Sequence, residues 1–199
     1  MARRSKNKSM DKFDRTWHLA HTPLEIDVVE FEYALMRTFE AFGRWQTECL
    51  SSVIDFAASG PENALLHTIR MNDRPKSIHD LAYMTNREDI PNIQYSLRKL
   101  IKSGLVERNG SGRAGVTYEA TALGKDVTDR YAEVRSALLI DAVQHVPELG
   151  QRLEGAARTL ELMTGIFAQA ARNAATHRRR PGSFAVPTQP KAAATQSNE

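Results

Sequence analysis

Residues 92–108 read NIQYSLRKLIKSGLVER, a segment that predicts a helix ended by a glycine and followed by a short strand. The apolar residues of the segment recur at steps of three or four, as one buried helix face requires, and they are Ile93, Leu97, Leu100 and Ile101. Gly104 is expected just past the helix end, where glycine accepts a left-handed backbone. The residues left facing outward or flanking are Asn92, Gln94, Tyr95, Arg98, Lys99 and Lys102.

Two shorter helices are expected before this segment, and a hairpin after it. The first runs from Pro61 to about Met71, with Leu65, Leu66 and Ile69 inward. After a turn at 72–75, Ser77 caps the second, over residues 77–84. Residues 105–108 and 116–120 predict two strands joined by a glycine-rich turn at 109–112. Three short helices followed by a hairpin is the order of a winged helix-turn-helix, in which one helix braces the next against the major groove.

The charge of this region supports DNA as its partner. From Tyr95 to Arg113 five basic residues face one acidic residue, a net charge of +4, whereas the whole chain of 199 residues carries +3. Arginine, lysine, asparagine and glutamine bond base edges and phosphates, and an arginine at a wing tip can enter a minor groove. The predicted DNA-binding residues are Ser77, Asn92, Gln94, Tyr95, Arg98, Lys99, Lys102, Arg108 and Arg113. The alternatives are that the outer face of the helix is an ordinary solvated face and that the hairpin tip is a surface turn without a function.

The flanking segments predict helices on both sides of this domain. Residues 1–22 are expected to form a basic flexible arm, and 23–58 a long helix capped by Thr22 and stopped at 59–61. Residues 59–121 form the winged helix-turn-helix, 122–178 further helices that begin at the cap Thr121, and 179–199 a disordered tail. A heptad seam marks the last helix, at Leu153, Ala156, Leu160, Met163, Phe167, Ala170 and Ala174. This seam suits either a partner subunit or an intramolecular core. The fold class is therefore mainly α with a small β-hairpin wing.

Two of these motifs resemble the MarR family of regulators. The recognition helix followed by Gly104-Leu105-Val106-Glu107-Arg108 is similar to the family's Gly-Leu-Val-x-Arg. Ala120-Thr121-Ala122-Leu123-Gly124 is similar to its Leu-Thr-x-x-Gly, whose threonine caps the long dimerisation helix. The resemblance covers about residues 61–145. It departs at the wing tip, where Ser111 stands in place of the family's aspartate, and in a longer N-terminal arm and first helix.

The resemblance implies a homodimer built from helices 23–58 and 122–178, bound to double-stranded DNA at a pseudo-palindromic operator. It also implies release from DNA by a small aromatic or acidic effector. A crevice for that effector is expected at Phe39, Phe42, Trp45 and Cys49, which are equally suited to a core. Cys49 is a candidate redox sensor, although its neighbour Glu48 gives no help in lowering the thiol pKa.

Other function classes find less support. None of the six histidines forms a zinc-protease or nucleophile motif, and a single cysteine rules out an internal disulfide and a cysteine-based zinc cluster. We expect no enzyme activity, no cofactor and no metal. No stretch approaches the ~20 apolar residues of a membrane span, so no membrane partner and a cytoplasmic location are expected. A nonspecific DNA-architectural protein and a helical partner-binding scaffold remain as alternatives.

Overall fold

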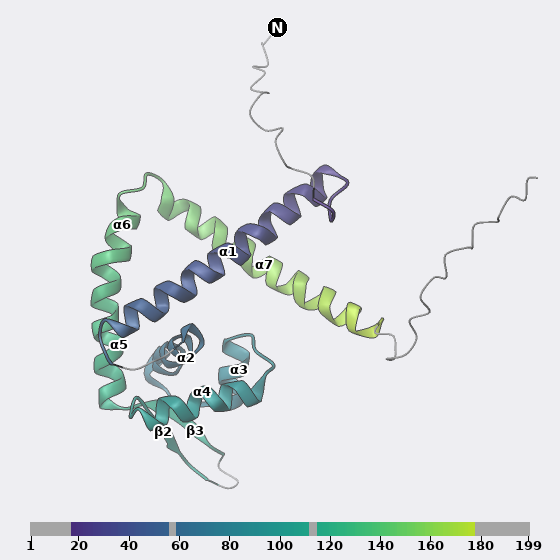
Figure 1. Cartoon of the computed structure of the whole chain (residues 1–199). Helices are drawn as coiled ribbons and strands as arrows, with labels where there is room; N and C mark the ends of the chain where they lie inside the picture. Colours follow the sequence, from purple (N-terminus) through teal and green to yellow (C-terminus); the bar gives the residue numbers. More distant parts are fainter. Residues whose placement is uncertain (1–16, 56–58, 112–114, 178–199) are drawn as a thin grey trace, which may run out of the picture. The chain divides into compact units, whose positions relative to one another are not determined.

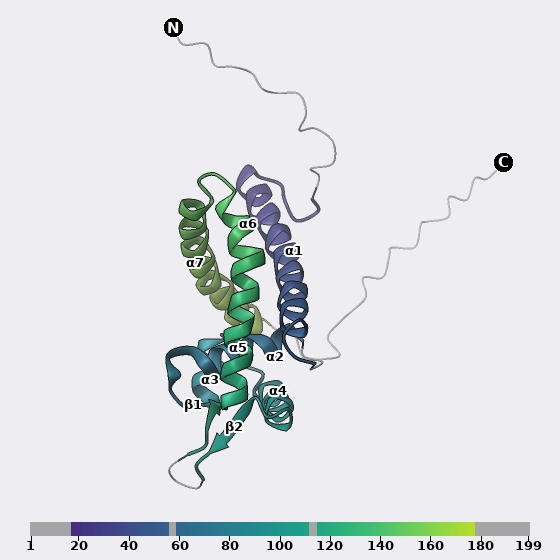
Figure 2. The same cartoon turned by 90° about the vertical axis from the view of Figure 1, so that its left-hand side faces the viewer.

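The computed structural model describes residues 17–55, 59–111 and 115–177. It divides into two units, residues 1–141 and 142–199, which we describe separately. The first unit contains helices and a small sheet (Figure 1), and Figure 2 shows helix α4 and the hairpin at the same end of this unit, beside the start of α5. Its helices are α1 (Pro23–Ser51), α2 (Gly60–Arg70), α3 (Ile78–Met84), α4 (Ile90–Lys102) and α5 (Ala122–Arg135). Its strands are β1 (Lys76–Ser77), β2 (Val106–Asn109) and β3 (Thr117–Ala120).

Helix α1 begins where the sequence predicts and ends earlier. Thr22 caps it together with the carboxylate of Glu25, and Pro23 occupies the first turn. The helix ends at Ser51, so the prediction that it extends to residue 58 is wrong. The amides of Val53 and Ile54 both bond to the carbonyl of Leu50 and turn the chain. After this turn, Val53 and Ile54 pack against the core as partly buried side chains.

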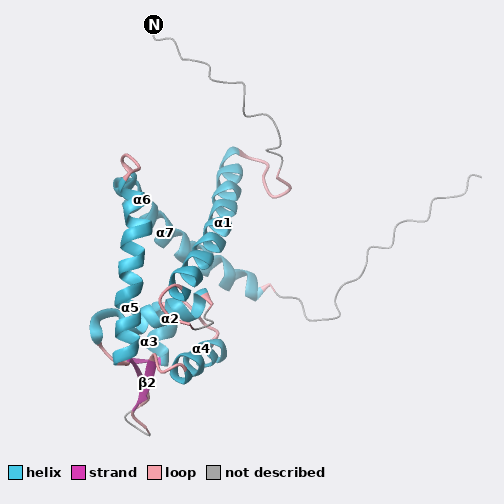
Figure 3. Cartoon of the chain, turned by 60° about the vertical axis from the view of Figure 1, so that its left-hand side comes forward, coloured by secondary structure: helices cyan, strands magenta, loops and turns pink. Residues whose placement is uncertain are grey.

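The sheet has three antiparallel strands in the order β1-β3-β2. Figure 3 shows the strands in magenta, at the lower end of the picture. The predicted hairpin is confirmed, with Val106 opposite Ala120 and Arg108 opposite Tyr118. The third strand, β1, was expected only as the end of a turn and the cap of a helix. Lys76 in β1 pairs with Tyr118, which lies 42 positions away in the chain. A two-residue strand has no periodicity of its own, so its pairing depends on contacts distant in sequence.

The core lies between α2, α4, the sheet and α5. The predicted inward residues of α2 are buried, and so are those of α4 except Ile101, which is partly buried. Other buried members of the cluster include Leu81, Leu105, Val106, Val127 and Tyr131. Gly104 has a φ of +74°, as its position after α4 requires. A Cβ on Gly124 would overlap the carbonyl of Leu105. The close approach of α5 to the backbone of Leu105, just before β2, therefore requires glycine at position 124. The predicted cap Thr121 accepts a hydrogen bond from the amide of Gly124 at 3.0 Å.

Helix α5 continues into a π-helical turn, Ser136–Ile140, and then into α6 (Asp141–Gln144). The second unit contains α7 (Leu149–Thr176), and the whole predicted heptad seam lies within this helix. Apolar side chains of α7 are exposed in the single chain, including Leu153 and Leu160. None of the helices in the described ranges is long and apolar enough to cross a membrane.

Candidate DNA-binding surface

Helices α3 and α4 are joined by a turn that is fixed by charge. The guanidinium of Arg87 donates two hydrogen bonds to the carboxylate of Asp89, at 2.8 and 2.7 Å. Asp89 precedes α4, and its carboxylate also accepts a hydrogen bond from the side-chain amide of Asn92 at 3.1 Å. The Arg87 and Asn92 bonds hold the pKa of Asp89 far below its ordinary value. The first turn of α4 is therefore anchored before any ligand arrives.

The predicted outer face of α4 is exposed. Ile93, Leu97 and Leu100 point into the core, while Ile101 is half-buried. The exposed side chains of the helix among those predicted for DNA contact are Asn92, Gln94, Tyr95, Arg98 and Lys102. This face carries two full positive charges and three hydrogen-bonding groups without an acidic side chain between residues 92 and 102. A phosphate backbone or the edge of a base can approach it directly.

Besides Asn92, which donates to Asp89, two more residues that were predicted to contact DNA have partners inside the protein. Lys99 lies 3.1 Å from the buried carboxylate of Glu62 on α2. The hydroxyl of Ser77 accepts a hydrogen bond from the amide of Asp80 and donates one to its carboxylate. Ser77 thus caps α3, as the sequence predicts. The sequence gives no signal for the Glu62 contact, because 37 residues separate the two partners.

The hairpin places one further predicted residue on the surface. Arg108 is exposed on β2, and its neighbour Asn109 donates a hydrogen bond to Glu119 on β3 at 2.8 Å. Gly110 and Gly115 both have φ of +80°, which favours glycine at the two ends of the turn. Arg113 at the wing tip lies outside the described residues.

A pocket of about 450 Å³ opens between α1, α2 and α5. It is lined by Phe42, Trp45, Gln46, His67, Arg70, Thr128, Asp129, Tyr131, Ala132, Arg135 and Leu139. Two of the four residues predicted for an effector crevice, Phe42 and Trp45, belong to this lining. Phe39 is 69% exposed on α1, and Cys49 is 2% exposed within the core. His67 and Arg135 were missed, because only the packing of α2 on α5 brings them to the aromatic pair.

Cys49 sits in an environment that suppresses thiol reactivity. Burial raises the pKa of its thiol, which donates a weak hydrogen bond to the carbonyl of Tyr131 at 3.9 Å. A reactive cysteine needs a lowered pKa and access to solvent. The environment of Cys49 therefore argues against a redox role.

The polar groups of the pocket wall are only partly satisfied. The His67 ring contacts the Tyr131 ring in a tilted arrangement, with 4.4 Å between the ring centres. Burial together with the nearby Arg135 lowers the pKa of His67. Within the described part of the chain, His67 Nε2 and Arg70 Nε are buried without a hydrogen-bond partner. Such atoms favour a polar group that would enter the pocket.

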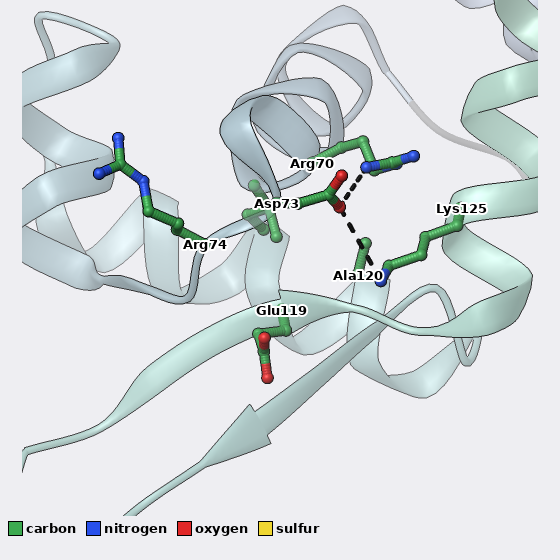
Figure 4. Close-up of a pocket in the computed structure, with 7 residues that line it drawn as sticks. Arg70, Asp73, Arg74, Glu119, Ala120 and Lys125 are labelled. Carbon is green, nitrogen blue, oxygen red and sulfur yellow. Dashed lines mark hydrogen bonds and ion pairs between the residues drawn. The ribbon is translucent and has the colours of Figure 1, made fainter.

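A second, much smaller hollow lies beside the sheet (Figure 4). Its volume is about 20 Å³, room for one water molecule. Asp73 lies between Arg70 and Lys125, with 3.8 Å separating its carboxylate from the Lys125 ammonium, while Arg74 points away (Figure 4). This arrangement is an ion cluster that ties the α2–β1 loop to α5. The structure also contains, over its described ranges, no cluster of three or more potential metal ligands.

Comparison with known proteins gives the helix and hairpin arrangement its name. Residues 59–124 match the family model described as winged helix DNA-binding domain. These residues form a winged helix domain. The match covers all of the predicted domain at residues 59–121. No match was found among curated proteins.

Solved structures extend the likeness beyond the winged helix domain. BldR, a transcriptional regulator from Sulfolobus solfataricus, has a TM-score of 0.57 at 20% identity, over 71% of this chain and 99% of that one. A mutant of MarR from E. coli, complexed with operator DNA, has a TM-score of 0.56 at 18% identity, over 70% and 99%. MarR from Staphylococcus aureus, in complex with salicylate and kanamycin, has a TM-score of 0.59 at 13% identity, over 73% of this chain and 95% of that one. The chain therefore has the fold of MarR regulators, which confirms the predicted fold class.

Proposed function

We propose that this chain is a sequence-specific transcription regulator that binds a pseudo-palindromic DNA site as a homodimer. The observation that carries the proposal is the exposed, positively charged outer face of α4 within a winged helix domain. In such domains the recognition helix enters the major groove and the wing lies along the backbone.

The positions of the exposed residues support a different task for each. Asn92 lies in the first turn of α4 and Gln94 directly after it, at the end that comes closest to the bases when a recognition helix enters by its N-terminus. Arg98 follows one turn later and can contact a guanine edge or a phosphate. Lys102 at the end of α4 and Arg108 on the hairpin suit phosphates on either side of the groove.

Apolar surface supports the homodimer. On α1 the side chains of Leu24, Met36, Phe39 and Phe42 are more than half exposed, and on α7 so is Leu162. Exposed side chains of this size, repeated along two long helices, favour burial in an interface. A two-fold dimer would present two winged helix domains, with half-sites about one helical turn apart.

The α1–α2–α5 pocket supports control by a small acidic aromatic molecule. Phe42 and Trp45 offer aromatic surface, while Arg70 and Arg135 offer positive charge. The solved relative from Staphylococcus aureus binds salicylate, an aromatic acid. A thermal-shift screen of phenolic acids tests this part of the proposal. We expect shifts in the unaltered protein that disappear in Arg135→Met, and a screen without any shift would contradict it.

The test of the main proposal is selection of bound fragments from a random double-stranded DNA pool at near-physiological salt. A palindromic motif with half-sites about one turn apart is the expected result. Binding without a motif would instead indicate a nonspecific architectural protein. Absence of binding would favour a scaffold that uses the seam on α7.

A further inference from the structure

Glu62 is a buried carboxylate at the start of α2, with 4% of its surface exposed. Its Oε2 atom accepts a hydrogen bond from the backbone N–H of Ser59 at 2.7 Å and another from the Ser59 hydroxyl. These bonds belong to the capping box that begins the helix. A capping box needs only one oxygen of the carboxylate, so the other contacts of Glu62 require a separate explanation.

Those other contacts come from the recognition helix. The hydroxyl of Ser96 donates to Glu62 Oε1 at 3.2 Å, and the ammonium of Lys99 lies 3.1 Å from Oε2. Ser96 and Lys99 are three residues apart, so they lie on the same face of α4. Ser96 is buried, and the Lys99 ammonium also lies 5.8 Å from the centre of the Tyr95 ring. One side chain of α2 thus holds two successive turns of α4.

The charge of Glu62 makes its contact with Ser96 and Lys99, which we call the joint, sensitive to the loss of a partner. Burial raises the pKa of Glu62, but the hydrogen bonds from Ser59 and the Lys99 ammonium outweigh burial and hold it below its ordinary value. The group is therefore ionised at neutral pH. A buried charge that loses its partner is strongly unfavourable, so α4 cannot move away from α2 without a replacement for Lys99.

We propose that Glu62 is a positioning residue that fixes the position of the recognition helix α4 against α2 through Ser96 and Lys99. In this arrangement Lys99 serves the joint and does not contact a DNA phosphate. The inference rests on the proposed DNA-binding function. All outward side chains of α4 share one rigid helix. If α4 is held less firmly against α2, these side chains are displaced together, which weakens base contacts most.

Two single variants and their combination test the joint, with two matched controls. Glu62→Gln removes the charge while glutamine still supports a capping box, and Lys99→Met removes the ammonium with little loss of length. Ser59→Ala weakens the cap and removes one hydrogen bond to Glu62, but it leaves the backbone N–H bond of residue 59 and the contacts of Glu62 with Ser96 and Lys99 in place. Lys102→Met removes a neighbouring exposed charge from the same helix. The full chain is used throughout, with the duplex recovered from the DNA selection and a scrambled duplex of equal length.

Dissociation constants are measured over a series of salt concentrations. We expect Glu62→Gln and Lys99→Met each to weaken binding to the selected duplex by about tenfold, the scale of one hydrogen bond to a charged group. Their salt slopes should equal that of the unaltered protein, and the double variant should be no weaker than either single one. Lys102→Met should instead lower the slope by about 0.9, the loss of one phosphate contact. Ser59→Ala should bind as the unaltered protein does.

Two results would overturn the inference: a lowered salt slope in Lys99→Met, or an unchanged dissociation constant in Glu62→Gln. If the DNA selection recovers no bound duplex, the proposed function is wrong, and amide hydrogen exchange then tests the contact between Glu62 and α4. Exchange within α4 should be faster in Glu62→Gln than in Ser59→Ala. Equal rates in these two variants would show that Glu62 does not hold α4.

Discussion

Single buried side chains determine the local geometry on which the winged helix domain rests. Lys76 is 6% exposed, and burial lowers the pKa of its ammonium. The ammonium donates hydrogen bonds to the carbonyls of Ile69 and Arg74, each at 3.0 Å, and to that of Met71. These carbonyls lie where α2 ends and the chain passes through positive φ at Asn72 and Asp73. A lysine therefore closes this turn by donating to three backbone carbonyls.

Replacing that lysine should be costly. Lys76→Met leaves carbonyls without their charged donor, and we expect the free energy of unfolding to fall by about 3 kcal/mol. Urea unfolding followed by circular dichroism measures it. The exposed Lys102→Met is the control, with an expected change within about 0.5 kcal/mol. An equal fall in the free energy of unfolding in the two variants would mean that the hydrogen bonds of Lys76 do not stabilise the fold.

His67 should make stability depend on pH. Its pKa is lowered by burial, and by Arg135, from an ordinary value of 6.5. As the pH falls below that value, the unfolded chain takes up a proton that the buried imidazole refuses, so unfolding becomes easier. Stability should thus be complete above the ordinary pKa and decline on acidification. The free energy of unfolding is measured between about pH 7 and 5.5, a window around the ordinary histidine pKa. It should fall less with decreasing pH in His67→Gln than in the unaltered protein. An equal pH dependence in the two proteins would contradict this assignment.

At the scale of elements, α4 is both a core helix and a surface helix. Its inner face is apolar, and its outer face carries the residues that we assign to DNA. Arg98 lies on the outer face, one turn beyond the first-turn residues. The turn before the helix, held by Arg87 and Asp89, sets where that outer face begins. Substitutions on the outer face should consequently change DNA binding without changing stability.

Arg98→Ala distinguishes base contact from phosphate contact. We expect it to cost about 1–3 kcal/mol of binding to the selected site and to relax preference at one base position. The measurement is a repeat of the DNA selection with the variant, alongside its thermal unfolding. If Arg98 only touches phosphate, binding to all sequences should weaken equally.

At the scale of the whole molecule, long helices flank the winged helix domain in the sequence. Leu160 belongs to the heptad seam of α7 and is 42% exposed in the single chain. In the proposed homodimer, Leu160→Glu should shift the equilibrium from dimer to monomer, because an interface core disfavours an unpaired charge. Sedimentation equilibrium measures the change. Gln151→Glu lies off the seam on the same helix and should remain dimeric, and a dimeric Leu160→Glu would exclude the seam from the interface.

The sequence by itself determined the elements that local rules govern. Helix α4, its glycine at residue 104, the caps at Thr22, Ser77 and Thr121 and the β2–β3 hairpin all follow from periodicity, capping and turn chemistry. Only the tertiary structure decided what depends on distant contacts. It paired β1 with β3, ended α1 at Ser51, placed Cys49 in the core and gave Lys99 to Glu62. The physical reason is that periodicity records which face is buried, whereas a partner across the fold leaves no mark in the neighbouring residues.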